Sequence, residues 1–187
     1  MNIVFWGLII GVPLAIGGAL AVFSKDLALR AFERFAASRR GAWFLTAIAW
    51  LWTAYECHII GIDVFDMILK IFPGELWILA TVLTYLTIIW MPNYLATRAL
   101  MGLFMLLPAE LFKTTRLLLP QSGVATVHIL VVLGYILAII GMYGMFYPWR
   151  IEKVLKKILG KGAARIAYGA VCLIAGIAAI TAGFVLA

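Results

Sequence analysis

His58 and His128 are the only two histidines of the chain, and both fall inside apolar segments. Within the helical segments defined below, each lies roughly 5 to 6 Å from the same end of the predicted bundle, at about 1.5 Å of rise per residue. Two neutral imidazoles at matching depth on separate helices suit a haem b iron held between membrane helices. One hypothesis is therefore a haem b electron-transfer protein linked to quinone. The competing interpretations are interfacial hydrogen bonding and proton transfer.

Glu56 is the deepest carboxylate of the second apolar segment, and an intramembrane carboxylate is a candidate functional group. It precedes His58 by two positions, about 200° around a helix, so the two side chains face nearly opposite ways. Glu56 is therefore either protonated or paired with a group on another helix, for which Lys113, Arg116 or a tyrosine hydroxyl is suitable. A structural pin between helices is favoured over proton transfer.

Arg98 and Glu110 lie near opposite ends of the fourth apolar segment, and Lys113 follows Glu110 by about one helical turn. Pro108 frees a backbone carbonyl there, and such breaks sometimes line substrate paths in transporters. A second hypothesis is therefore a small transporter or channel that uses Glu56, Arg98 and Glu110 along a polar path. The segment around Pro108 is also the best candidate for a re-entrant loop rather than a crossing helix.

Stripes of small residues predict close helix packing. Gly169, Gly176 and Gly183 recur every seven residues in the last apolar segment, and Gly7 and Gly11 form a GxxxG pair in the first. Because glycine has no side chain, the backbones of two helices can approach each other at these positions. A seven-residue repeat predicts a left-handed crossing. The partner is either another helix of this chain or a second subunit.

Motifs of known enzymes are missing from the sequence. It contains no nucleophile and base arrangement, no phosphate-cradling loop and no metal-ligand spacing. Cys57 and Cys172 fall inside predicted helices and form no CxxC pair. The sequence therefore disfavours an enzyme with its own active site.

The composition places the chain in a membrane. Of 187 residues, 66% are hydrophobic and 12% charged, and the mean hydropathy is +1.11, whereas soluble domains are about half apolar and about a quarter charged. The apolar part is enough for about six spans of about 20 residues, and the remainder is too short for a separate soluble domain. The net charge is +7, and the basic residues that produce it cluster in connections between apolar segments. This placement disfavours nucleic acid as a partner.

The apolar segments predict an all-α bundle of about six membrane helices. Their expected ranges are 3–23, 41–61, 75–91, 95–112, 124–147 and 166–187. Two further segments, 25–40 and 149–160, combine apolar and charged residues at helical spacing, so we expect amphipathic helices that lie in the membrane interface.

The positive charges predict the orientation. Twelve of the 15 lysines and arginines lie in or beside the first, third and fifth connections, which places these connections on the cytoplasmic side and both termini outside. Six of these side chains are expected to contact anionic lipid headgroups. They are Arg39, Arg40, Arg150, Lys153, Lys156 and Lys157.

Short loops, glycine stripes and interfacial helices favour a small integral subunit of a larger membrane complex. We expect this complex to be energy-transducing, and the role of the chain to be anchoring, packing and lipid binding. The expected partners are the bilayer, its anionic lipids and other membrane subunits. The expected location is a bacterial inner membrane or its organellar equivalent.

Overall fold

The computed structural model describes residues 3–60, 75–118 and 125–186, and every regular element in these ranges is a helix. The predicted all-helical fold is therefore confirmed in the described ranges. The helices are α1 (Ile3–Phe23), α2 (Lys25–Ala37), α3 (Arg39–Ile60), α5 (Glu75–Trp90), α6 (Leu95–Leu118), α7 (Ala125–Phe146), α8 (Pro148–Gly160) and α9 (Gly162–Val185).

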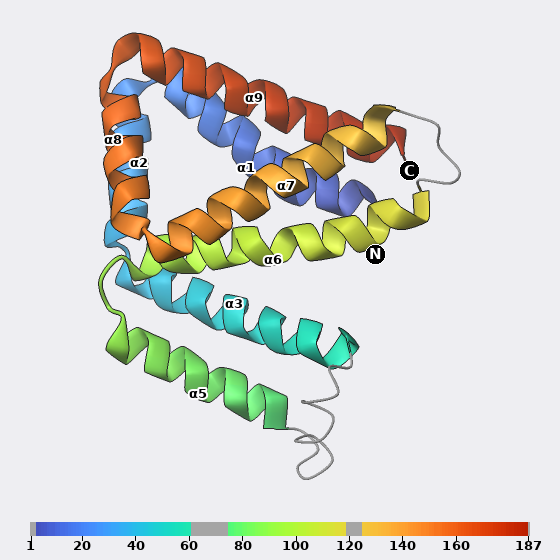
Figure 1. Cartoon of the computed structure of the whole chain (residues 1–187). Coiled ribbons are helices and arrows are strands. Elements are labelled where there is room, and N and C mark those ends of the chain that lie inside the picture. Colours follow the sequence, from blue (N-terminus) through green and yellow to red (C-terminus); the bar gives the residue numbers. More distant parts are fainter. Residues whose placement is uncertain (1–2, 61–74, 119–124, 187) are drawn as a thin grey trace.

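Six of the described helices run back and forth, each opposite in direction to the previous one (Figure 1). They are α1, α3, α5, α6, α7 and α9. The two short helices α2 and α8 pack side by side across one end of this bundle, and both chain termini lie at the other end. Four helices, α1, α6, α7 and α9, are long and apolar enough to cross a membrane, as expected of an integral membrane protein.

The other two bundle helices are less typical of membrane spans. α5 is apolar but has only 16 residues, and α3 begins with two arginines and contains Glu56. α5 lies at the edge of the bundle and packs chiefly against α3 (Figure 1). Its outer side chains are large, apolar and exposed. They include Trp77, Ile78, Val82, Tyr85 and Ile89.

Several helix boundaries differ from those expected. α3 begins at Arg39, so Arg39 and Arg40 open a bundle helix instead of closing the amphipathic one. α9 begins at Gly162, before the expected residue 166. α6 continues through Pro108 to Leu118 as one helix, with neither an end near residue 112 nor a re-entrant turn. Proline is tolerated in apolar helices whose neighbours compensate for the lost hydrogen bond.

The first and last helices pack together along their glycines. In antiparallel order, Gly7, Gly11 and Gly18 of α1 face Gly183, Gly176 and Gly169 of α9. A Cβ atom at Gly18 would lie 2.6 Å from the carbonyl oxygen of Gly169. Because no side chain stands between them, the two backbones approach to direct contact. The five glycines singled out in the sequence therefore meet in one contact inside the chain.

α7 packs on α6 in a similar way. A Cβ atom at Gly141 would lie 2.7 Å from the carbonyl oxygen of Met101. Between these two helices and the α1/α9 pair lies the main apolar core, in which Trp6 is 1% exposed and Leu111 is fully buried. The core therefore joins the first and last helices to the α6/α7 hairpin.

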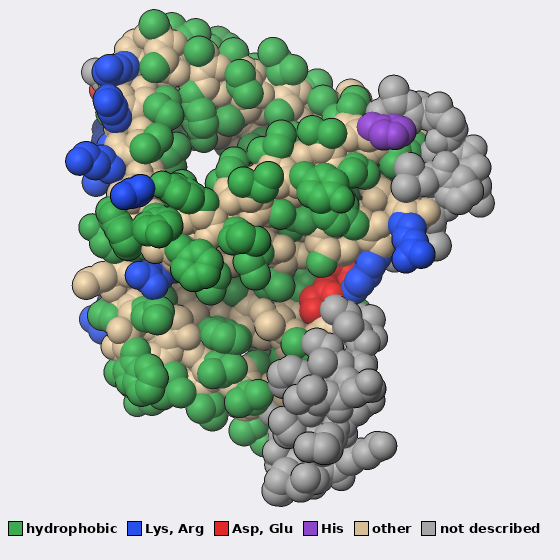
Figure 2. Space-filling model, in the orientation of Figure 1, with side chains coloured by type: hydrophobic (Ala, Val, Ile, Leu, Met, Phe, Trp, Pro, Cys, Tyr) green, Lys and Arg blue, Asp and Glu red, His purple; other side chains and the backbone are tan. Residues whose placement is uncertain are grey.

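α2 and α8 are fixed to the bundle by apolar and polar contacts. Leu159 of α8 packs in one buried cluster with Ala21 of α1. Thr97 of α6 donates a hydrogen bond of 2.6 Å to Glu152 of α8. At the same end of the bundle, Arg165 of α9 donates one of 2.6 Å to the carbonyl oxygen of Ala21, which joins α9 to α1. Lysine and arginine side chains gather along the outer side of this end (Figure 2).

Candidate functional site

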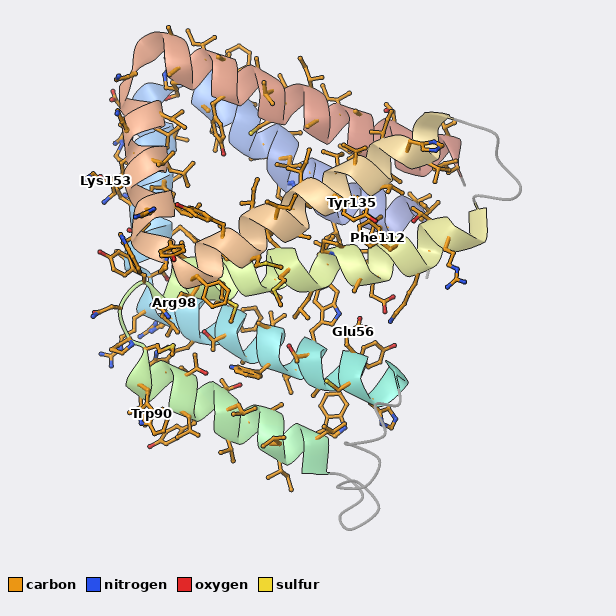
Figure 3. The ribbon with its side chains drawn as sticks, viewed as in Figure 1. Glu56, Trp90, Arg98, Phe112, Tyr135 and Lys153 are labelled. Atoms are coloured by element: carbon orange, nitrogen blue, oxygen red, sulfur yellow. The ribbon has the colours of Figure 1, made fainter. Side chains whose placement is uncertain are left out.

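Three charged side chains form a cluster between α3 and α6, towards the end of the bundle that carries the termini (Figure 3). Lys113 Nζ lies 2.7 Å from Glu56 Oε2 and 2.7 Å from Glu110 Oε1. The Glu56 side chain is only 7% exposed, whereas that of Lys113 is 41% exposed. One lysine thus bridges the buried carboxylate of Glu56 on α3 and the more exposed carboxylate of Glu110 on α6.

Two tryptophans connect this cluster to α1. Trp52 Nε1 donates a hydrogen bond of 3.0 Å to Glu56 Oε1, and the Trp52 ring stacks on Trp6 at a centroid distance of 5.8 Å. Each carboxylate oxygen of Glu56 therefore has its own donor. Trp6 Nε1 is buried and has no hydrogen-bond partner.

The cluster has the geometry of a pin that holds α1, α3 and α6 together. A buried charge is tolerated when it is paired and its remaining lone pairs accept hydrogen bonds, and Glu56 meets both conditions. Lys113 is one of the three partners that the sequence suggested for Glu56. Trp52 was not predicted as a partner, although a spacing of four residues places it beside Glu56 on a helix.

The structure does not bring the two histidines together. Both His58 on α3 and His128 on α7 are exposed. The helix ends that carry them lie at the same end of the bundle, as expected, but α6 lies between α3 and α7 (Figure 1). Within the described ranges, no group of three or more His, Cys, Asp or Glu side chains is arranged to hold a metal ion.

Arg98 lies apart from the charged cluster, at the beginning of α6 (Figure 3). The helical rise puts it about 18 Å along α6 from Glu110, so the three residues of the hypothetical polar path are not adjacent. Its Nη1 atom lies 3.3 Å from the Met91 sulfur, and its Nε atom is buried without a partner.

A partly enclosed apolar cavity of about 280 Å³ lies beside Arg98, between α3, α5 and α6. Its wall includes Thr46, Thr53 and Thr87, whose hydroxyl groups donate to carbonyl oxygens of their own helices. These threonines therefore present little free polarity to the cavity. This cavity was not predicted, and its only signal in the sequence is a stripe of small residues on α3 and α6.

The basic end of the molecule carries the six predicted headgroup contacts, all of them exposed. Lys153 projects from α8 away from the bundle (Figure 3), and Arg39 lies over the Trp43 ring at 5.3 Å. The Tyr143 hydroxyl, 3.5 Å from Arg150 Nη1, helps to raise the pKa of the Arg150 guanidinium, which stays charged. The arrangement suits contact with an anionic surface.

No known protein family, curated protein or solved structure matches this chain.

Proposed function

We propose that the chain spans a bacterial inner membrane, or its organellar equivalent, six times, with α2 and α8 on the cytoplasmic surface and both termini outside. The proposal is supported by α3 and α5, which run alongside the four long apolar helices (Figure 1). It is also supported by the basic side chains at the α2/α8 end, because basic segments remain on the cytoplasmic side. α5 is about 24 Å long, and local thinning lets a bilayer accommodate so short a span.

Fusions of alkaline phosphatase, which is active only outside the cytoplasm, test this topology. A fusion after Ile60 is expected to be active, and one after Lys161 inactive. The Ile60 fusion is the decisive one, because an α3 and α5 hairpin that stays inside would leave the orientation of the four long helices unchanged. An inactive Ile60 fusion would reject six spans.

For the function, we propose a non-catalytic subunit of a larger membrane complex, with an anchoring, packing and lipid-binding role. The observation that carries this proposal is the position of α5, a short helix that packs chiefly against α3 and exposes large apolar side chains along its outer face. A second membrane subunit on this face would hold α5 by the side-chain packing that stabilises membrane helices.

Photo-crosslinking in the native membrane tests this role. Tyr85 on α5 is 64% exposed, and Tyr135 on α7, 58% exposed, is a matched control. A benzophenone amino acid at position 85 is expected to form a protein adduct, and the same group at position 135 to label lipid. Mass spectrometry of the adduct identifies the partner and shows whether the complex is energy-transducing. Lipid adducts at both positions would reject the subunit role.

The two other hypotheses have less support. The haem hypothesis needs His58 and His128 on either side of one iron, and α6 lies between the helices that carry them. The transporter hypothesis needs a polar path, and Arg98 lies about 18 Å along α6 from Glu110. An absorption spectrum without a Soret band would reject haem. Unchanged flux in Glu56→Gln proteoliposomes would remove the transport role of Glu56.

A further inference from the structure

Arg98 has no anionic partner among the described side chains. Its guanidinium is in contact with the Met91 thioether, which is a weak acceptor, and its Nε donor is buried without a partner. Among the described side chains, no carboxylate forms an ion pair with it. An unpaired donor on a charged group in a partly buried place is costly, so an anionic ligand is the expected partner.

The cavity beside Arg98 is suited to one hydrocarbon chain. Its volume of about 280 Å³ is just below the range of about 300–1,000 Å³ that is typical of small-molecule sites. The lining on α6 runs from Leu95 to Leu106, about 16 Å along the helix. That length is about half of the ~30 Å hydrocarbon core, which is the depth of one leaflet.

The position of Arg98 relative to the cavity matches the layout of a phospholipid. Arg98 lies at the beginning of α6, the end nearer to α2 and α8 (Figure 3). A second hollow, of about 180 Å³, shares Leu95 with the first and is lined by Arg39 and Trp43 near the basic surface. The apolar cavity therefore adjoins a more polar hollow that carries a second positive charge.

We propose that this cavity binds one acyl chain of an anionic phospholipid from the leaflet on the α2/α8 side, with the lipid phosphate on Arg98. The guanidinium presents a planar fork of donors, which matches the oxygens of a phosphate. The proposal rests on the membrane topology given above and is independent of the subunit role. It defines a lipid site that is distinct from the exposed lysines and arginines of α8.

Gly102 offers a way to block the cavity without disturbing the fold. It lines the cavity, and a Cβ atom built on it meets nothing within 4 Å. A leucine at position 102 therefore extends into the space of the acyl chain. Gly17 is the matched control, because its Cβ atom also meets nothing within 4 Å and it lines a different apolar cavity, of about 250 Å³, that Arg98 does not line.

The test is native mass spectrometry of the full chain, purified in mild detergent and offered equal amounts of phosphatidylglycerol and phosphatidylcholine. The wild-type protein and Gly17→Leu are expected to retain one phosphatidylglycerol molecule. Arg98→Ala is expected to lose the preference for phosphatidylglycerol by about tenfold, whereas Arg40→Ala, at an exposed arginine of α3, keeps it. Gly102→Leu is expected to lose the retained lipid while its unfolding temperature is unchanged or higher.

Several results would overturn the proposal. Retention of phosphatidylglycerol by Gly102→Leu would show that the lipid lies elsewhere, and an unchanged preference in Arg98→Ala would show that the guanidinium does not hold its phosphate. Displacement of the lipid by equimolar palmitate would identify a fatty-acid site instead. Failure of the wild-type protein to retain phosphatidylglycerol, together with an active Ile60 fusion, would reject this proposal alone, whereas an inactive fusion would reject the topology on which it rests.

Discussion

Gly11 and Gly176 exclude each other's side chains. A Cβ atom on Gly11 would lie 2.6 Å from the carbonyl oxygen of Gly176, and one on Gly176 would lie 2.7 Å from the carbonyl oxygen of Gly11. The obstacle is backbone in both directions, so no rotamer change relieves it. The pairing joins the first helix of the bundle to the last, and the stability of the bundle therefore depends on two residues 165 positions apart.

Gly11→Ala is expected to destabilise the protein by about 1–3 kcal/mol, because the two helices must separate to accommodate the methyl group. Gly17→Ala, in the same helix, is the control, because its Cβ atom meets nothing within 4 Å. It is expected to be neutral or to stabilise by up to about 1 kcal/mol through helix propensity. Thermal unfolding in one detergent measures both, and equal midpoints would contradict the close approach of α1 and α9.

The glycine stripes show how much of the helix packing can be predicted from the sequence. The stripe formed by Gly169, Gly176 and Gly183 indicates that its helix packs closely against another helix. It does not indicate which helix, because a row of small residues can pack against any other row of small residues. The stripe containing Gly7 and Gly11 had the same ambiguity, and only the three-dimensional arrangement paired the two. The helices themselves were predictable because apolar length and turn residues are local properties.

The charged cluster was predictable only in part, for the same physical reason. A carboxylate inside a membrane needs a charged or hydrogen-bonding partner. Few side chains of the sequence could be that partner of Glu56, and Lys113 is one of them. The cavity at Arg98 could not be predicted from the sequence, because an internal space depends on how α3, α5 and α6 diverge. The expected span 95–112 already passed through Pro108, and the re-entrant alternative there does not form, because proline breaks helices in water more readily than in packed apolar surroundings. The extension of α6 from residue 112 to Leu118 was not predicted.

Lys113→Met is expected to destabilise the protein by about 3 kcal/mol, because it leaves the Glu56 carboxylate buried without its counter-charge. This value is at the lower end of the usual range, since the Lys113 side chain is 41% exposed. In the double variant Glu56→Gln, Lys113→Met, the loss is expected to be smaller than in Lys113→Met alone, since no unpaired charge remains. Thermal unfolding of all variants measures the coupling, and additive losses would contradict a stabilising ion pair between Glu56 and Lys113.

Trp52→Phe is expected to destabilise the protein by about 2 kcal/mol, because Glu56 loses one hydrogen-bond donor while the ring stacking on Trp6 is kept. Trp50 provides a matched control on the same helix. Its Nε1 atom also donates at 3.0 Å, but to the neutral hydroxyl group of Thr87. Trp50→Phe is therefore expected to cost about 1 kcal/mol. The reverse order in chemical or thermal unfolding would contradict a charged Glu56.

Arg165 provides the last prediction, because it joins the beginning of α9 to the end of α1. Its Nη1 atom donates to the carbonyl oxygens of Ala21, at 2.6 Å, and Val22, at 3.3 Å. A cation at the carboxyl end of a helix satisfies free carbonyl groups and the helix dipole. Arg165→Met is therefore expected to cost about 1–2 kcal/mol and to speed hydrogen exchange in the last turn of α1.

Lys161→Met is the control for that measurement, because Lys161 is exposed at the same end of α9. Its effect on stability is expected to stay within about 0.5 kcal/mol, and the exchange of the α1 amides to stay unchanged. Arg165→Lys keeps the charge but replaces the guanidinium, whose Nη1 atom donates to both carbonyl oxygens, with an ammonium group on a different stem, so an intermediate loss is expected. Equal exchange in Arg165→Met and the wild-type protein would show that Arg165 does not hold the end of α1.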